Sequence, residues 1–215
     1  MTPTAINLPL EAGQNITLSP VSWSRFEQVL AELPQRRLSR LAYANKILEI
    51  MTPLPEHERA KIVLADLVKT LLRLQKRPWE ALGSTTFKRQ EMAVGVEPDE
   101  CFYIQNYQAV IGKDTLDLNS DPPPDLAIEI DVTSITKQAA YLTLKVPELW
   151  IYTQGKLTIY IFQEDQYQLS NNSLIFAGIP IIELIERFMK RAKIVGVSQM
   201  LLEFEEYVNN LLLKK

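Results

Sequence analysis

The chain has 215 residues but only one cysteine, one histidine and seven glycines. Cys101 alone cannot form an intramolecular disulfide, so we expect a cytoplasmic protein in a reducing compartment. With His57 as the single histidine, a histidine-rich metal site is not expected. There is also no glycine-rich loop of the kind that cradles a nucleotide phosphate. These absences leave carboxylates and lysines as the main candidates for chemistry.

Long apolar runs and an excess of one charge are also lacking. The longest apolar stretches are interrupted well short of the roughly 18 residues that a membrane-spanning helix needs, so we expect no membrane partner. The N-terminus has no basic start followed by an apolar core, which disfavours a secretory signal. A net charge of −3 and a pI near 5.4 exclude binding to nucleic acid through overall positive charge. Any such contact must come from a local patch.

The composition, 47% hydrophobic and 23% charged, is typical of a globular protein, and the length predicts a single domain over 1–215. Helical and strand-like patterns alternate along the chain, which predicts a mixed α/β fold. In chain order we expect an irregular N-terminal arm over 1–20, a helix over 22–33, a hairpin turning at 44–46, a long helix over 56–76, an antiparallel pair of strands over 84–90 and 99–105, a strand from 125, a helix over 134–145, strands over 148–153, 156–162 and 166–170, and helices over about the last 35 residues.

The segment PPPDLAIEID, residues 122–131, carries the most information. A strand alternates faces, so Asp125, Glu129 and Asp131 share one face while the leucine and isoleucines between them face the other way. Carboxylates on one face repel unless something positive lies between them, and Mg²⁺ is one such partner. A solvated acidic face, or ion pairs with nearby lysines, would explain the pattern equally well.

A second Pro-Asp step lies in EPDE, residues 97–100, just before another strand. If the two strands are neighbours, Asp99 and Glu129 could hold one metal ion between them. An ordinary turn is the alternative, because proline and aspartate both favour turns.

Lys137 lies in the first turn of the helix that follows Ser134. A cation there interacts unfavourably with the helix dipole, at a cost of up to about 1 kcal/mol. Such local conflicts tend to occur at functional sites, where an ammonium group could orient a water or stabilise negative charge. Tyr141, four residues later, shares its face. An ordinary surface lysine is the competing interpretation.

Together, Asp99, Asp125, Glu129 and Lys137 are the parts of a metal-dependent phosphodiester hydrolase. The segments GSTTFKR, GVEPDECFYIQN, DPPPDLAIEIDVTS and VPELWIY resemble the Uma-two family, restriction-endonuclease-like proteins of the PD-(D/E)xK nuclease superfamily. The resemblance runs over about 39–188, followed by a C-terminal helix over about 196–215.

This resemblance implies an α/β, restriction-endonuclease-like core with a central mixed β-sheet flanked by helices. It implies cleavage of DNA with Mg²⁺, or with Mn²⁺ as an alternative, and a homodimer. By motif, Asp99, Asp125 and Glu129 would be the metal ligands, and Lys137 would join them in catalysis. Asp131 stands where the superfamily usually has its lysine, as if that lysine had moved to the helix.

The sequence leaves two other functions open. The same fold could be catalytically inactive and serve as a module that binds nucleic acid or a protein. A glycosidase-type carboxylate pair is a third reading, but it needs a sugar-binding cleft, and no sequence feature selects for one.

The partners are less defined. Lys69, Arg73 and Lys76 form a helical stripe that could touch phosphates or simply be solvated, so we expect weak, salt-sensitive DNA binding. Apolar residues on the last helix, such as Phe204 and Val208, favour a dimer if they are exposed but suit core packing equally.

Overall fold

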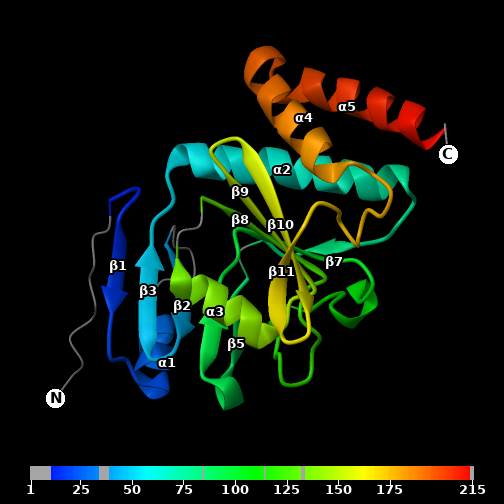
Figure 1. Cartoon of the computed structure of the whole chain (residues 1–215). Coiled ribbons are helices and arrows are strands. Elements are labelled where there is room, and N and C mark those ends of the chain that lie inside the picture. The colour runs from blue at the N-terminus through cyan, green and yellow to red at the C-terminus, as the bar shows by residue number, and fades with distance from the viewer. Residues whose placement is uncertain (1–10, 34–38, 84, 114, 132–133, 214–215) are drawn as a thin grey trace.

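The computed structural model describes residues 11–33, 39–83, 85–113, 115–131 and 134–213. They form two β-sheets with helices packed against them (Figure 1). This arrangement confirms the predicted mixed α/β fold. The two sheets differ in kind, because one is antiparallel throughout and the other is mixed.

The first sheet contains the N-terminal hairpin. Its tight turn is made by Asn45 and Lys46, which both have positive φ (52° and 62°), as a hairpin turn of this length requires. Helix α1 (Trp23–Glu32) covers one face through Phe26, whose ring stacks on Tyr43 at 4.7 Å between centroids. In sheet order the strands are β1 (Asn15–Leu18), β3 (Ile47–Met51), β2 (Arg40–Ala44), β6 (Val94–Val96) and β5 (Phe87–Arg89).

The second sheet contains the strand from PPPDLAIEID. Its strands β8 (Leu126–Ile130) and β9 (Glu148–Thr153) are parallel and its other pairs are antiparallel, which confirms the expected mixed sheet. Parallel neighbours need a crossover, and helix α3 (Ile135–Leu144) supplies it. In sheet order the strands are β11 (Gln166–Ser170), β10 (Lys156–Gln163), β9 (Glu148–Thr153), β8 (Leu126–Ile130), β7 (Glu100–Tyr103) and β4 (Glu80–Ala81).

The two faces of β8 pack into different cores. Leu126, Ile128 and Ile130 are buried with helices α2 (Pro55–Leu74), α4 (Ile181–Val195) and α5 (Val197–Leu212). Ala127 faces the opposite way, into a core formed with α3 and the first sheet. The predicted alternation along this strand is therefore confirmed, and its carboxylate-bearing face lies on the α3 side.

Two expectations differ from the structure. The predicted strand pair over 84–90 and 99–105 is wrong, because β5 belongs to the first sheet and β7 to the second. The reason is that Val94–Val96, which lies between β5 and β7 in the sequence, forms a strand of its own, β6, and pairs with β5. Likewise, residues 15–18 of the expected irregular arm form β1, paired with β3. Residues 1–10 of that arm lie outside the described residues.

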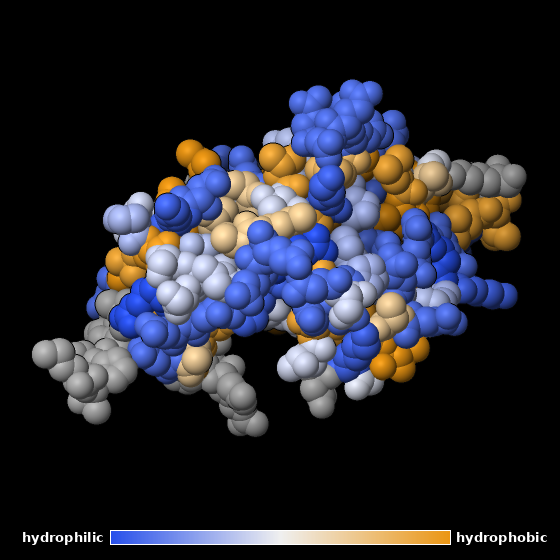
Figure 2. Space-filling view, turned by 90° about the horizontal axis from the view of Figure 1, so that it is seen from below, coloured by the Kyte–Doolittle hydropathy of each residue, from blue (hydrophilic) through white to orange (hydrophobic). Residues whose placement is uncertain are grey.

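The C-terminal helices are part of the core. Helix α5 matches the helix expected over 196–215, whereas the expected limit of the core at residue 188 falls inside α4. Phe204 and Val208 are fully buried within the chain, so core packing explains them and they give no support to a dimer. Among the described helices, none is both long and apolar enough to cross a bilayer. Viewed from below, most of the visible surface is hydrophilic (Figure 2).

The contact between β6 and α1 leaves no room for a side chain at Gly95. A Cβ atom there would lie 2.7 Å from Cζ of Phe26. We expect Gly95→Ala to lower the free energy of unfolding by about 1–3 kcal/mol, measured by urea denaturation. Phe26→Leu removes that ring, so the double variant should lose less free energy of unfolding than the two single variants lose together. A fully stable Gly95→Ala protein would contradict this packing.

Candidate active site

Six carboxylates are buried in the described part of the chain, and their partners differ. Burying a carboxylate is costly unless it is well bonded, so the partners indicate what each one does. Glu148, for example, accepts hydrogen bonds from the backbone N–H groups of Leu174 and Ile175 and from the Trp150 indole. The six are Glu97, Asp99, Glu100, Asp125, Glu129 and Glu148.

Asp125 has a structural environment of this kind. Its carboxylate accepts the backbone N–H groups of Ile104 at 2.6 Å, Gln105 at 2.9 Å and Asn106 at 3.3 Å. It thereby fixes the turn that follows β7. Asp125 precedes β8, whereas Glu129 lies near the other end of that strand. The structure therefore does not bring Asp125 to the expected metal site.

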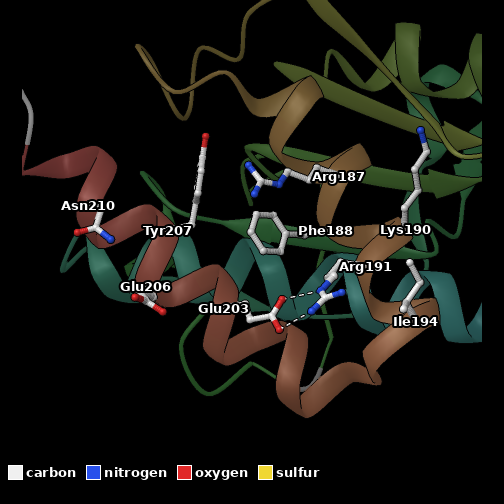
Figure 3. A pocket seen from close by; sticks show the side chains of 9 residues that line it. All are labelled: Arg187, Phe188, Lys190, Arg191, Ile194, Glu203, Glu206, Tyr207 and Asn210. Atoms are coloured by element: carbon white, nitrogen blue, oxygen red, sulfur yellow. Dashed lines mark hydrogen bonds and ion pairs between the residues drawn. The ribbon is translucent and has the colours of Figure 1, made fainter.

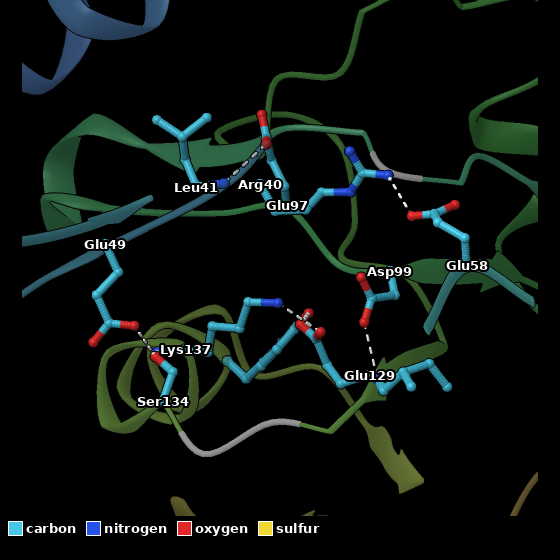
Figure 4. A network of polar contacts seen from close by, with 11 residues as sticks. Arg40, Leu41, Glu49, Glu58, Glu97, Asp99, Glu129, Ser134 and Lys137 are labelled. Atoms are coloured by element: carbon cyan, nitrogen blue, oxygen red, sulfur yellow. Dashed lines mark hydrogen bonds and ion pairs between the residues drawn. The ribbon is translucent and has the colours of Figure 1, made fainter. Parts of the chain in front are cut away.

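Asp99 and Glu129, in contrast, come together. Strand β7 runs antiparallel to β8 with Glu100 opposite Ile128, so the next pair in register is Asp99 and Glu129. Asp99 is held by the backbone N–H of Ile130, at 2.8 Å from Oδ2 (Figure 4). The two strands with Pro-Asp steps are thus neighbours, as the sequence argument required.

Glu129 is completely buried and is bonded by side chains alone within the described residues. Lys137 Nζ lies 2.7 Å from its Oε2, and the Tyr141 hydroxyl donates to Oε1 at 2.5 Å. Both donors come from one face of α3, because they are four residues apart. Side chains can move aside without breaking a strand or turn, so this carboxylate can exchange its partners as Asp125 cannot.

Burial governs the charges of this cluster. It raises the pKa of Glu129 to about 8, against the opposing attraction of Lys137. For Lys137, burial works to lower the pKa, but the negative charges of Glu129 and Asp99 outweigh it and raise the pKa above its usual value. Burial, followed by the charge of Glu129, also raises the pKa of Tyr141 well above its usual value. An additional cation beside Glu129 would favour its ionised form.

A small cleft of about 40 Å³ opens beside Lys137, between the two sheets. That volume has room for about three water-sized groups. Side chains from both sheets and from α3 line it. The polar side chains from the first sheet are Asn15, Arg40 and Glu49, and the polar ones from the other side are Asp131, Ser134 and Lys137.

Glu49 holds the start of the helix that carries Lys137 through hydrogen bonds. Its carboxylate accepts a hydrogen bond from the Ser134 hydroxyl (Figure 4) and, at 2.6 Å, one from the Thr136 hydroxyl. Ser134 in turn caps α3 by accepting the backbone N–H of Lys137. This negative charge at the helix start offsets the unfavourable position of the lysine. No sequence motif marked Glu49 or Arg40, because both come from the distant first sheet.

Asp131 does not continue the carboxylate face of β8. Its backbone is left-handed, with φ of 53°, which turns the side chain off the strand pattern. Its carboxylate contacts His57 Nε2 at 3.0 Å and accepts the Thr153 hydroxyl at 2.6 Å. His57 is therefore not an isolated surface residue, since it ties the start of α2 to the end of β8.

The donor set fits a hard cation with few protein ligands. Within the described residues, no three histidine, cysteine or acidic side chains converge closely enough to hold a metal ion. Mg²⁺ nevertheless commonly binds through one or two carboxylates and completes its shell with water and substrate oxygens. Asp99 and Glu129 supply such a pair, next to the cleft.

A larger groove of about 600 Å³ lies between α4 and α5 (Figure 3). Arg191 and Glu203 bridge it through hydrogen bonds of 2.7 and 2.9 Å. These helices pack on the α2 side of the second sheet, whereas α3 and Lys137 lie on the opposite side. The groove is therefore separate from the carboxylate cluster.

Comparisons with known proteins agree with this arrangement. Residues 23–180 match the model of the Uma2 family, described as "Putative restriction endonuclease". A crystal structure of "a putative nuclease belonging to DUF820" from Anabaena variabilis is similar, with a TM-score of 0.50 and 16% identity over 85% of this chain and 99% of that chain. At that identity the likeness supports the restriction-endonuclease-like fold alone. No curated protein matches.

Asp125 offers a test of the structural role. We expect Asp125→Ala to lower the free energy of unfolding by about 3 kcal/mol, because three backbone N–H groups lose their acceptor. Asp125→Asn keeps one acceptor oxygen and should lower the free energy of unfolding by a smaller amount. Urea denaturation measures both. If Asp125→Asn left stability unchanged but abolished metal binding in calorimetry, Asp125 would be a metal ligand after all.

The raised pKa of Glu129 predicts how stability depends on pH. Between about pH 5 and 8 the folded state holds a proton on Glu129 that the unfolded chain has released, so the stability of the wild type should fall as pH rises. Glu129→Gln cannot titrate and lacks this contribution. In EDTA, the melting temperature of the wild type minus that of Glu129→Gln should therefore decrease from pH 5 to 8. A constant or increasing difference would contradict the assignment.

Proposed function

This chain belongs to the Uma2 family of restriction-endonuclease-like proteins, and from that premise we propose that it is a metal-dependent endonuclease that hydrolyses phosphodiester bonds in DNA. One observation carries the proposal. The buried Glu129 carboxylate lies beside Asp99 and is held by two side chains, of which Lys137 can give way to a cation while Tyr141 stays in place. The Asp125 carboxylate, in contrast, is bonded to three successive backbone N–H groups of one turn.

Each residue of the cluster has a distinct role in this proposal. Asp99 and Glu129 would hold Mg²⁺, or Mn²⁺ in its place, and the bound ion would polarise the phosphate and activate a water. The backbone N–H of Ile130 keeps Asp99 oriented. Lys137, released from Glu129, supplies positive charge to the phosphate oxygens during hydrolysis. Tyr141 continues to orient Glu129 through Oε1.

The competing function is a nuclease-fold module that binds nucleic acid or protein without cleaving. Both oxygens of Glu129 are already bonded, and the expected third carboxylate, Asp125, lies elsewhere. These two observations are what a degenerate site would show. Metal binding separates the two readings, because an intact site binds Mg²⁺ or Mn²⁺ through Glu129 and a degenerate one does not.

Cleavage of supercoiled plasmid tests the proposal directly. With Mg²⁺ or Mn²⁺, we expect nicking by the wild type and at least about 100-fold slower nicking by Glu129→Gln, Asp99→Asn and Lys137→Met. Lys88→Met is the matched control, since Lys88 forms an exposed ion pair with Glu27 in another part of the fold. It should cleave like the wild type.

The assay can also refute the proposal. Equal nicking by the wild type and all variants would point to a contaminating nuclease. No nicking by any of them, with no heat of metal binding in calorimetry, would favour the binding module.

A further inference from the structure

The cleft beside Lys137 has a second positively charged residue, Arg40, on its opposite wall. Arg40 is the first residue of β2 and is paired with Met51 of β3, at the end of the first sheet that faces α3. Its side chain is only 11% exposed. Arg40 therefore reaches the cleft from a different sheet and from a chain position almost 100 residues from Lys137.

Glu58 of α2 orients the Arg40 guanidinium. One of its oxygens lies 3.4 Å from an Arg40 terminal nitrogen (Figure 4), while the other binds Lys61 at 2.9 Å. Glu58 therefore positions the Arg40 guanidinium while it also binds Lys61. The positive charge of Arg40 also reaches Lys137, whose pKa it works to lower, though less than the neighbouring carboxylates raise it. The two carboxylates that line the same cleft have other partners, since Glu49 accepts the Ser134 and Thr136 hydroxyls and Asp131 contacts His57.

The chemistry of the two cations suits one ligand class. A phosphodiester group carries one negative charge on two non-bridging oxygens, and a guanidinium donates to such a pair through two parallel N–H groups. A lysine ammonium acts as a point charge on the other side. We propose that Arg40 binds the non-bridging oxygens of the DNA phosphate that enters this cleft, opposite Lys137. The inference rests on the proposed function for the identity of the ligand as DNA, and it adds a substrate-binding residue that lies outside the family's motif segments.

Binding without cleavage tests this role. In EDTA, fluorescence anisotropy with a short labelled DNA duplex gives the dissociation constant at several salt concentrations. Replacing a residue that contacts one phosphate should weaken binding and lower the slope of log K against log salt by about one. We expect Arg40→Met to bind about tenfold more weakly with that lower slope. Arg40→Lys, which keeps the charge but not the paired donors, should retain the slope and lose part of the affinity.

Arg191→Met is the matched control, because Arg191 is also paired with a glutamate but lies in α4, on the far side of the second sheet. It should bind DNA like the wild type. Melting temperatures establish that each variant is folded. If folded Arg40→Met and Arg191→Met proteins bind with the same affinity and slope, the assignment of Arg40 is wrong.

The outcome for Arg40 is distinguishable from that of the catalytic proposal. If the wild type nicks plasmid in a Glu129-dependent manner while Arg40→Met binds normally, only the Arg40 inference fails. If binding depends on Arg40 but the wild type never cleaves, the inference holds for a binding module and the nuclease proposal fails. If the wild type does not bind DNA at all, the Arg40 inference is overturned.

Discussion

The buried pair of Glu129 and Lys137 is the interaction on which the site depends. Ionising both groups of a pair that is almost inaccessible to water costs hydration that their attraction restores only in part, which is why the pKa of Glu129 is raised. Well-packed apolar residues of similar size would often be as stable or more so. The pair therefore contributes little to explaining the stability of the fold. It does place a carboxylate and a lysine at one cleft, which is what phosphodiester hydrolysis needs.

Three parts of the fold hold this pair in position. The antiparallel register of β7 and β8 sets Asp99 beside Glu129. The crossover helix α3 brings Lys137 and Tyr141 over the same strand face. Glu49, from the hairpin of the first sheet, accepts hydrogen bonds at the start of α3 and so fixes the turn that contains Lys137. The first sheet thus acts on the site twice, since Arg40 comes from the same hairpin.

The buried carboxylates also show how similar sequence patterns can have different roles. Asp99 and Asp125 both follow a proline and both precede a strand. Asp125 binds three successive backbone N–H groups and holds a turn. Asp99 reaches across to the end of β8, next to Glu129. The difference lies in which backbone groups the neighbouring strand presents, and a local pattern does not contain that information.

The sequence alone determined the local features of this protein. Alternation along 126–130, the helix that starts after Ser134 and the spacing of Lys137 and Tyr141 all follow from short-range geometry, and the structure has them. The family motifs also indicated the mixed sheet. Local patterns failed where the chain changes sheets, at β6, because a three-residue strand containing glycine resembles a loop.

Tertiary structure decided which residues meet. Strand register set Asp99 beside Glu129, and the turn after β7 engaged Asp125. A left-handed residue turned Asp131 toward His57. Packing of the first sheet against α3 brought Arg40 and Glu49 to the cleft. Contacts of this kind join residues that are distant in the sequence, such as Glu49 and Thr136, which are 87 positions apart. They depend on how sheets and helices pack as whole units, so no short segment of the sequence specifies them.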